Sequence, residues 1–154
     1  MPPRPPGDPG PLPYLSDQSD QERGALSVDV EVTLSTERMR QEGLAPQVLS
    51  RGSADAAMYW SAAQIVTHHS SNGCNLQPGD LIGTGTLSTD SVNGLGSLLE
   101  ISQGGKQHLQ LANGETRAFL EDGDEVTLKA WCEGEGAVCI GFGECVGRVV
   151  PSSS

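Results

Sequence analysis

A strict alternation of apolar and polar residues between Leu26 and Leu34 constrains the fold more than any other feature of the sequence. Apolar side chains stand at positions 26, 28, 30, 32 and 34, with polar side chains between them. Successive side chains of a β-strand point to opposite sides, so this segment is predicted to be a strand with one buried and one wet face.

Composition agrees with a β-rich chain that has short connections. The 154 residues are enough for one domain with a modest core, and 36% of them are apolar. Twenty glycines and ten prolines indicate many turns, which favours β structure over a helical bundle. Because Trp, Tyr and Phe occur only twice each, the core is expected to consist of Val, Leu and Ile.

Further strands are predicted after Pro78-Gly79-Asp80. Asn113-Gly114 and Asp122-Gly123 are strong hairpin signals, since these residue types favour tight turns. Glycines at positions 141, 143 and 147 indicate bulges or close backbone approach in the last segment. The segments predicted as strands are 81–88, 97–102, 108–111, 116–120, 124–132 and 138–150.

One helix is predicted, over residues 54–70, because apolar side chains recur there at helical spacing. Ser53 or Asp55 can cap its start, and Asn72-Gly73 offers a stop. The residues near its apolar face are Ala57, Met58, Ala62, Ile65, Val66 and His69.

Seven prolines fall within residues 1–13, which are therefore predicted to form an extended tail or linker. A Pro-rich ligand for a partner is the less favoured alternative. Residues 14–154 are predicted to form a partial domain, in which the mixed, polar stretch 36–51 is a loop or broken helix and the structure of 35–57 is left open. The expected fold is mainly β, a mixed β-roll or sandwich with one substantial helix.

The formal net charge of −11 disfavours two classes of partner. A negative surface repels phosphate backbones and anionic lipids, so neither nucleic acid nor a membrane is expected as a partner. No apolar run approaches the roughly 18 residues of a membrane span, and no secretory signal is visible.

The four cysteines, at positions 74, 132, 139 and 145, include no C-x-x-C pair. Reduced, structural thiols inside a β core are expected for them. Metal ligation is the less favoured interpretation.

An ordered set of short strings gives the strongest functional signal. The strings are D-P-G-P-L-P-Y-L at 8–15, M-Y-W at 58–60, T-H-H-S at 67–70, N-G-C-N-L at 72–76, P-G-D-L at 78–81, G-T-L-S at 85–88, G-S-L-L-E at 96–100, N-G-E-T-R at 113–117, D-G-D-E-V at 122–126 and G-F-G-E-C at 141–145. In this order and spacing they resemble the C-terminal part of the fumarylacetoacetate hydrolase family. T-H-H-S followed by N-G-C-N-L favours its fumarylacetoacetases over related decarboxylases and hydrolases. The resemblance covers nearly the whole chain but is poor between residues 35 and 57.

The resemblance implies a hydrolase that cleaves a carbon–carbon bond of 4-fumarylacetoacetate, a diketo acid, to fumarate and acetoacetate in tyrosine and phenylalanine breakdown. It also implies a Ca²⁺ or Mg²⁺ ion, held by carboxylates, that polarises the substrate oxygens. A histidine aligned by a glutamate activates water in this family. A cytoplasmic homodimer is expected for the full-length enzyme.

Two functional positions are carried onto this chain by the resemblance. Thr86, in G-T-L-S, matches a threonine that contacts substrate, and Glu100, ending G-S-L-L-E, matches the glutamate that aligns the catalytic histidine. From the residues alone, a hydroxyl beside Gly85 suits a carboxylate ligand, and a carboxylate amid apolar neighbours needs a partner when it is buried. The alternatives are an ordinary strand threonine and a solvent-facing strand glutamate.

Other polar residues invite a metal site but have simpler explanations. His68 and His69 point about 100° apart on a helix, so one packing and one hydrogen-bonding histidine is expected rather than a shared metal. Turn chemistry explains Asp122 and Asp124 better than calcium binding does. Glu133-Gly134-Glu135 is expected to be an exposed turn.

The metal ligands and the catalytic histidine of the family lie upstream of the region that this chain matches, so no metal ligand is assigned here. The chain is therefore expected to be a C-terminal fragment that is inactive by itself. Two other classes of function stay open. One is a non-catalytic β module that associates with a complete subunit, and the other is a module that binds a small carboxylate through Thr86.

Overall fold

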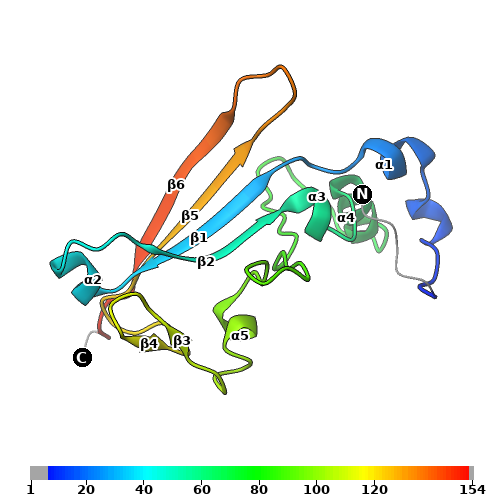
Figure 1. Ribbon diagram of the computed structural model, residues 1–154. Helices are drawn as coiled ribbons and strands as arrows, with labels where there is room; N and C mark the ends of the chain where they lie inside the picture. The colour runs from blue at the N-terminus through cyan, green and yellow to red at the C-terminus, as the bar shows by residue number, and fades with distance from the viewer. Residues whose placement is uncertain (1–6, 153–154) are drawn as a thin grey trace.

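A four-stranded antiparallel sheet organises the chain, which a computed structural model describes over residues 7–152. The strand order is β2-β1-β5-β6, so β1 and β5 lie in the middle of the sheet (Figure 1). The bounds are β1 Asp29–Ser35, β2 Gln47–Ser53, β5 Glu125–Cys132 and β6 Ile140–Arg148. The predicted mainly β class is confirmed.

The alternating segment forms β1, although the strand begins at Asp29 rather than at residue 26. It pairs with β2 on one side and with β5 on the other. Leu34 is fully buried, and Thr33 and Ser35, which point to the opposite face, are buried as well. This end of β1 is therefore covered on both faces rather than on one.

The prediction of a loop or broken helix for residues 36–51 missed a strand. The segment holds a short helix, α2 Glu37–Gln41, and most of β2. Val32 pairs with Ser50 whereas Thr33 pairs with Val48, so Leu49 is an extra residue in a bulge. A bulge breaks the alternation by which a strand is recognised in a sequence.

The single helix predicted over residues 54–70 is two helices, α3 Ala54–Ala57 and α4 Ala62–Ser70. Ser61 begins α4 with a capping box, in which its hydroxyl accepts from Gln64 N and the Gln64 side chain accepts from Ser61 N. Gln64 is buried and Val66 is exposed, so the buried face of α4 is not the predicted apolar one.

The later strand predictions succeeded where turns define hairpins. Asn113-Gly114 joins β3 Leu109–Gln110 to β4 Thr116–Arg117, and the β5–β6 hairpin carries a bulge beside Gly143, whose φ is +82°. Residues 81–88 form no strand, and residues 97–102 contain a helical turn, α5 Leu98–Ile101, that begins at a serine cap. Those two predictions were wrong because the apolar residues involved find no strand partner.

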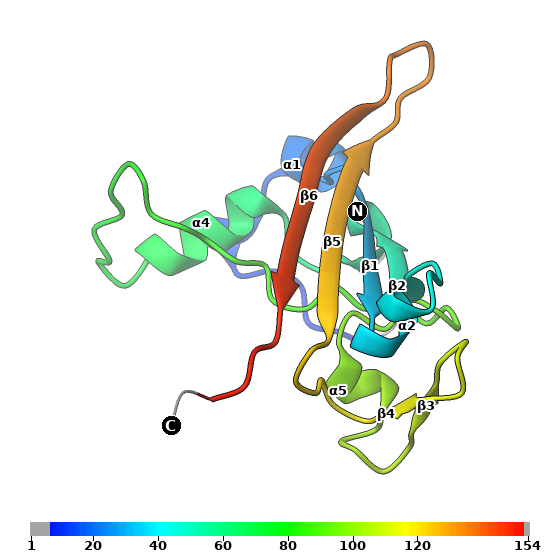
Figure 2. The same cartoon turned by 90° about the vertical axis from the view of Figure 1, so that its left-hand side faces the viewer.

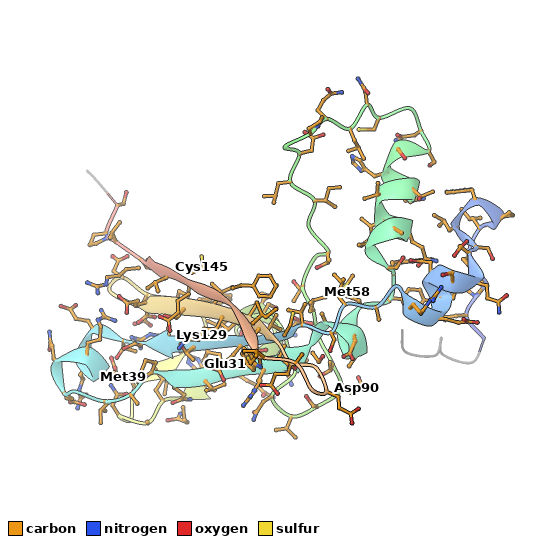
Figure 3. All side chains as sticks on the ribbon, turned by 90° about the horizontal axis from the view of Figure 1, so that it is seen from above. Glu31, Met39, Met58, Asp90, Lys129 and Cys145 are labelled. Atoms are coloured by element: carbon orange, nitrogen blue, oxygen red, sulfur yellow. The ribbon has the colours of Figure 1, made fainter. Side chains whose placement is uncertain are left out.

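The two faces of the large sheet differ in chemistry. Across one face, Arg51, Glu31, Lys129 and Glu144 lie in register on successive strands, and Lys129 Nζ is 2.7 Å from Glu144 Oε1 (Figure 3). The opposite face is apolar towards the β6 edge. Its residues, called the open apolar face below, are Val30, Val32, Leu128, Ala130, Phe142 and Cys145. They line a groove of about 300 Å³ together with Gly143 and the charged residues Glu31, Lys129 and Glu144.

The packed core lies at the end of the sheet that carries α2 and the β3–β4 hairpin. Leu34, Met39 and Leu111 are buried together, where β1 meets α2 and the segment that joins β3 to β4. Figure 3 shows Met39 at this end of the sheet and Met58 far from it, near the helical part. Beneath the core, the side chains of Arg117 and Asp124 form a buried ion pair, with Nε 2.8 Å from Oδ2.

A smaller helical part packs against one end of β1 and β2. It consists of η1 Pro13–Leu15, α1 Gln18–Arg23, α3 and α4, and α4 projects away from the sheet (Figure 2). Gln64 Nε2 donates to Leu15 O at 2.9 Å, and the Ser61 hydroxyl donates to Asp20. Of the Pro-rich stretch, residues 1–6 lie outside the described part and the boundary at residue 13 stays a prediction, while Asp8 accepts from the Tyr59 hydroxyl at 2.6 Å.

The chain exposes far more surface than a compact protein of its mass. Its accessible surface is 10309 Å², whereas a folded 16.1 kDa monomer exposes about 7,400 Å². The eight undescribed residues, even if counted as fully exposed chain, account for at most about 1,200 Å² of this excess. Strand β6 is exposed along its whole length.

The cysteines do not lie in a core, contrary to the prediction. Cys74, Cys139 and Cys145 are exposed, Cys132 is half-buried, and all four are free thiols. The reason is positional, because Cys74 and Cys139 lie in loops and Cys145 lies on the open apolar face.

Candidate functional site

Two serine hydroxyls hold the Glu100 carboxylate. Glu100 lies in α5, whose N-cap is Ser97, and the Ser97 hydroxyl donates to Glu100 Oε2 at 2.7 Å while it accepts from Glu100 N at 3.2 Å. The Ser88 hydroxyl lies 2.9 Å from both carboxylate oxygens. The carboxylate is therefore fixed in one orientation although it is exposed to solvent.

Gly96 brings the Thr86 segment to the start of α5. A side chain at position 96 would begin 2.2 Å from Leu87 O and 2.7 Å from Thr86 Cγ2, which no side chain can occupy. Gly96 N also donates to the Ser88 hydroxyl at 3.0 Å. The two positions singled out from the sequence, Thr86 and Glu100, thus lie on neighbouring segments joined at one glycine.

The serines favour the ionised form of Glu100. Hydrogen bonds from Ser97, and then from Ser88, lower the pKa of the Glu100 carboxyl, and the small loss of solvation opposes them. A carboxylate accepts up to about four hydrogen bonds, so exposed lone pairs stay available for a cation or an imidazole N–H. Glu100 is exposed, as the alternative of a solvent-facing glutamate expected, but it lies in a helical turn and not on a strand, and it is not buried among apolar residues.

Thr86 lies at the edge of a small pocket and not on a strand. The pocket has a volume of about 160 Å³, and Thr84, Thr86 and Leu87 form one of its walls. The other wall consists of residues 57–60 and Ile65. The neighbouring Gly85 has a φ of +79°, a backbone conformation that glycine adopts without strain. The pocket can admit a small group beside the Thr86 hydroxyl.

A loop ties this site to the large sheet. Thr89 N donates to Gly94 O at 2.8 Å, which closes the turn between the two halves of the site. Arg51 N, on the edge strand β2, donates to Asn93 O, also at 2.8 Å. The position of Glu100 is therefore set by backbone hydrogen bonds as well as by its serines.

Sequence reasoning missed Ser88, Ser97 and Gly96. Ser97 could have been found, because a serine three residues before a glutamate is the signature of a helix start. Ser88 ends the string G-T-L-S, but no local pattern links it to a carboxylate twelve residues later.

The two histidines of α4 have separate partners. His68 Nδ1 lies 2.9 Å from the Tyr14 hydroxyl, and the two rings stack with their centroids 6.3 Å apart. His69 Nε2 lies 3.3 Å from Cys74 Sγ. Both histidines therefore form hydrogen bonds, and His68 also provides the packing contact that was expected of one of them.

The acidic turns differ from one another. Asp124 is fully buried and accepts from Arg117 and from Glu121 N, so it stabilises the structure. Glu133 and Glu135 are exposed in the β5–β6 loop, as predicted. Within residues 7–152, no three His, Cys, Asp or Glu side chains come together in a way that could hold a metal ion. The described residues therefore do not fit the Ca²⁺ or Mg²⁺ ion of the family.

Comparison with known proteins identifies the lineage. Residues 15–150 match the model of the fumarylacetoacetate (FAA) hydrolase C-terminal region. The chain belongs to the fumarylacetoacetate hydrolase family. It is 43% identical over 150 residues to the fumarylacetoacetase of Homo sapiens, 41% identical over 145 residues to that of Arabidopsis thaliana and 38% identical over 147 residues to that of Dictyostelium discoideum.

These alignments cover 97%, 94% and 94% of this chain but only 34%, 32% and 32% of the relatives. The chain thus spans about a third of the length of the curated relatives that it matches. In the described range, no helix of this fumarylacetoacetate hydrolase family member is long and apolar enough to cross a membrane. The cytoplasmic location stays a prediction.

Proposed function

We propose that this chain forms one part of a fumarylacetoacetase-type active site, in a hydrolase that cleaves 4-fumarylacetoacetate to fumarate and acetoacetate. The observation that carries the proposal is the Glu100 carboxylate, which two serines hold in one orientation on a segment that approaches Thr86 at Gly96. The family membership of the chain supplies the reaction class.

In this proposal Glu100 acts as the acid of a catalytic triad. A carboxylate that accepts an imidazole N–H holds the ring in one tautomer and stabilises the imidazolium that forms when the other nitrogen takes a proton from water. Ser88 and Ser97 have a positioning role, because they prevent the carboxylate from rotating away. The Thr86 hydroxyl donates to an oxygen of the substrate that enters the adjoining pocket.

The base is proposed to come from residues outside those described. Within residues 7–152, the hydrogen bonds of the Glu100 side chain go to serines, and none of the three histidines, His68, His69 and His108, is bonded to it. His68 and His69 instead bind Tyr14 and Cys74. The divalent ion also needs ligands from other residues, because within residues 7–152 no three His, Cys, Asp or Glu side chains come together to hold one. We therefore propose that the 154-residue chain has no turnover by itself.

The exposed surface favours a chain that is completed by further protein. The excess over a compact monomer is larger than the about 800 Å² that each partner buries in an ordinary interface. The open apolar face and the unpaired edge of β6 are the surfaces that such protein would cover.

A chimaera tests the role of Glu100. The C-terminal third of a fumarylacetoacetase relative is replaced by residues 15–150 of this chain, and consumption of 4-fumarylacetoacetate is followed. The wild-type chimaera is expected to turn over, and Glu100→Gln is expected to lower kcat by roughly 10²-fold or more, since an amide cannot stabilise the imidazolium. The matched control Glu133→Gln changes an exposed loop glutamate and is expected to leave kcat unchanged. A Glu100→Gln chimaera as active as the control would contradict the proposal.

A second function is favoured by the open apolar face alone. A non-catalytic module that associates with a complete subunit would also expose such a face before it binds. Native mass spectrometry of this chain with a full-length relative distinguishes the two. A mixed complex whose activity is indifferent to Glu100→Gln would favour the module.

A further inference from the structure

His69 and Cys74 form a thiol–imidazole pair outside the Glu100 site. Cys74 Sγ lies 3.3 Å from His69 Nε2, and both side chains are exposed. His69 is in the last turn of α4, and Cys74 is in the loop that follows. Neither residue has a role in the proposed hydrolysis.

A compact turn creates this pair. Gly73 has a φ of +88°, and its N–H donates to Ser70 O at 3.0 Å, so the chain reverses directly after the helix. The Asn72 side-chain oxygen accepts from Cys74 N at 3.2 Å, which fixes the next residue. These bonds return Cys74 to the imidazole that lies five residues earlier.

The position of His69 suits a base. At 3.3 Å, the Cys74 thiol can donate its proton to a neutral imidazole. The thiolate, rather than the thiol, is the nucleophile of a cysteine. His69 is therefore placed to take up the thiol proton as the Cys74 sulfur attacks an electrophile.

The same histidine borders an apolar pocket. The pocket has a volume of about 490 Å³, lies between α4 and residues 9–15, and includes His68 and His69 among its lining residues. Cys74 itself does not line this pocket, so the pocket adjoins the thiol–imidazole pair only through His69.

From these observations we propose that Cys74, with His69 as its base, is a modification site for small α,β-unsaturated carbonyl compounds. The thiol proton passes to His69 Nε2, and the sulfur electron pair forms a bond to the β-carbon of the electrophile. The carbon–carbon π electrons move to the α-carbon and carbonyl as an enolate, which takes the proton back from the imidazolium. The net change is addition of S–H across one double bond, so no oxidant or reductant is needed.

The other exposed thiols provide an internal control. Cys139 lies in the β5–β6 loop and Cys145 on the open apolar face, and neither sulfur has a basic hydrogen-bond partner among the described residues. Cys139 is the better match for Cys74, because it is also an exposed loop residue.

The test uses the full chain and N-ethylmaleimide as the electrophile. After short pulses at neutral pH, peptide mass mapping gives the rate of modification of each cysteine. Cys74 is expected to react about tenfold faster than Cys139. His69→Gln should reduce the Cys74 rate to that of Cys139, while His68→Gln should leave it unchanged. In every variant the Cys139 rate should stay constant, which shows that the fold is intact.

Two results would overturn the proposal. One is equal rates at Cys74 and Cys139 in the wild-type chain. The other is a Cys74 rate that His69→Gln does not lower, or that His68→Gln lowers equally.

Discussion

The two ends of the large sheet differ in how completely they are covered. At the end that carries α2 and the β3–β4 hairpin, Leu34, Met39 and Asp124 are fully buried. At the end that carries the β5–β6 hairpin, Leu128 and Phe142 are 48% and 67% exposed. The first end is a finished core, whereas the second presents apolar surface of the kind that proteins normally cover.

This difference distinguishes the residues that stabilise the fold of the chain from the exposed residues that further protein would cover. Polar groups at the finished end satisfy one another, since Arg117 bridges to Asp124 while Glu115 accepts from Thr36 and Asn113. At the open end, α3 lies beside the ends of β1 and β2, whereas β6 is exposed along its whole length. Substitutions at the two ends should therefore have different effects on the isolated chain.

The largest effect is expected from breaking the buried ion pair. Asp124→Ala removes the shortest ion pair of the buried Arg117 guanidinium and leaves it only the longer contacts with Glu115 and Glu121, at 3.5 Å and 3.4 Å. The free energy of unfolding should therefore fall by about 3 kcal/mol. Lys129→Ala breaks an exposed ion pair with Glu144 at the open end and should cost about 1 kcal/mol or less. Urea unfolding followed by circular dichroism measures both. Equal losses of unfolding free energy in the two variants would contradict the difference in burial between the two ends of the sheet.

A second comparison uses two leucines of the same sheet face. Leu34→Ala opens a cavity in the packed core and should cost about 3 kcal/mol. Leu128→Ala trims a side chain that is already half exposed, so its cost should be about 1 kcal/mol or less.

Leu128→Lys sharpens the same comparison. A charge on the open apolar face should reduce self-association in sedimentation velocity runs and leave unfolding nearly unchanged. Unchanged self-association would mean that copies of the chain do not associate through the open apolar face.

The smallest effect is expected from pH. Hydrogen bonds from Thr36, and then from Asn113, lower the pKa of Glu115, with burial opposing them. A glutamate in an unfolded chain has a pKa of about 4.3. The stabilisation from the ionised Glu115 is therefore present above that pH and is lost as the pH falls through the lower pKa of the folded state. Glu115→Gln should flatten the loss of stability on acidification below about pH 4.3, whereas Glu133→Gln in the exposed loop should not. Identical pH profiles for the two variants would exclude this contribution.

Local patterns predicted the parts of the fold that local physics determines. The alternation in β1 and the Asn113-Gly114 turn each specify their structure within a few residues. β2 escaped prediction because a bulge at Leu49 interrupts its alternation, and the helix break before Ser61 depends on bonds to Leu15 and Asp20 from distant segments.

The sequence named candidate site residues, which stay predictions, but it did not predict their geometry. Thr86 and Glu100 came from a resemblance of short strings, which names positions without describing their surroundings. That Glu100 is exposed, in a helical turn and held by Ser88 depends on the close approach at Gly96, a contact between segments that no periodicity encodes.

The central claim is that this chain holds the glutamate of a catalytic site whose base lies elsewhere. The most direct measurement compares consumption of 4-fumarylacetoacetate by the purified chain alone and by the chain mixed with the upstream two-thirds of a fumarylacetoacetase relative, in a buffer with Ca²⁺ and Mg²⁺. We predict no turnover by the chain alone, and turnover in the mixture that Glu100→Gln abolishes. Turnover by the isolated chain that is lost in the Glu100→Gln variant would show that the base lies within this chain and would contradict the proposal that it lies elsewhere.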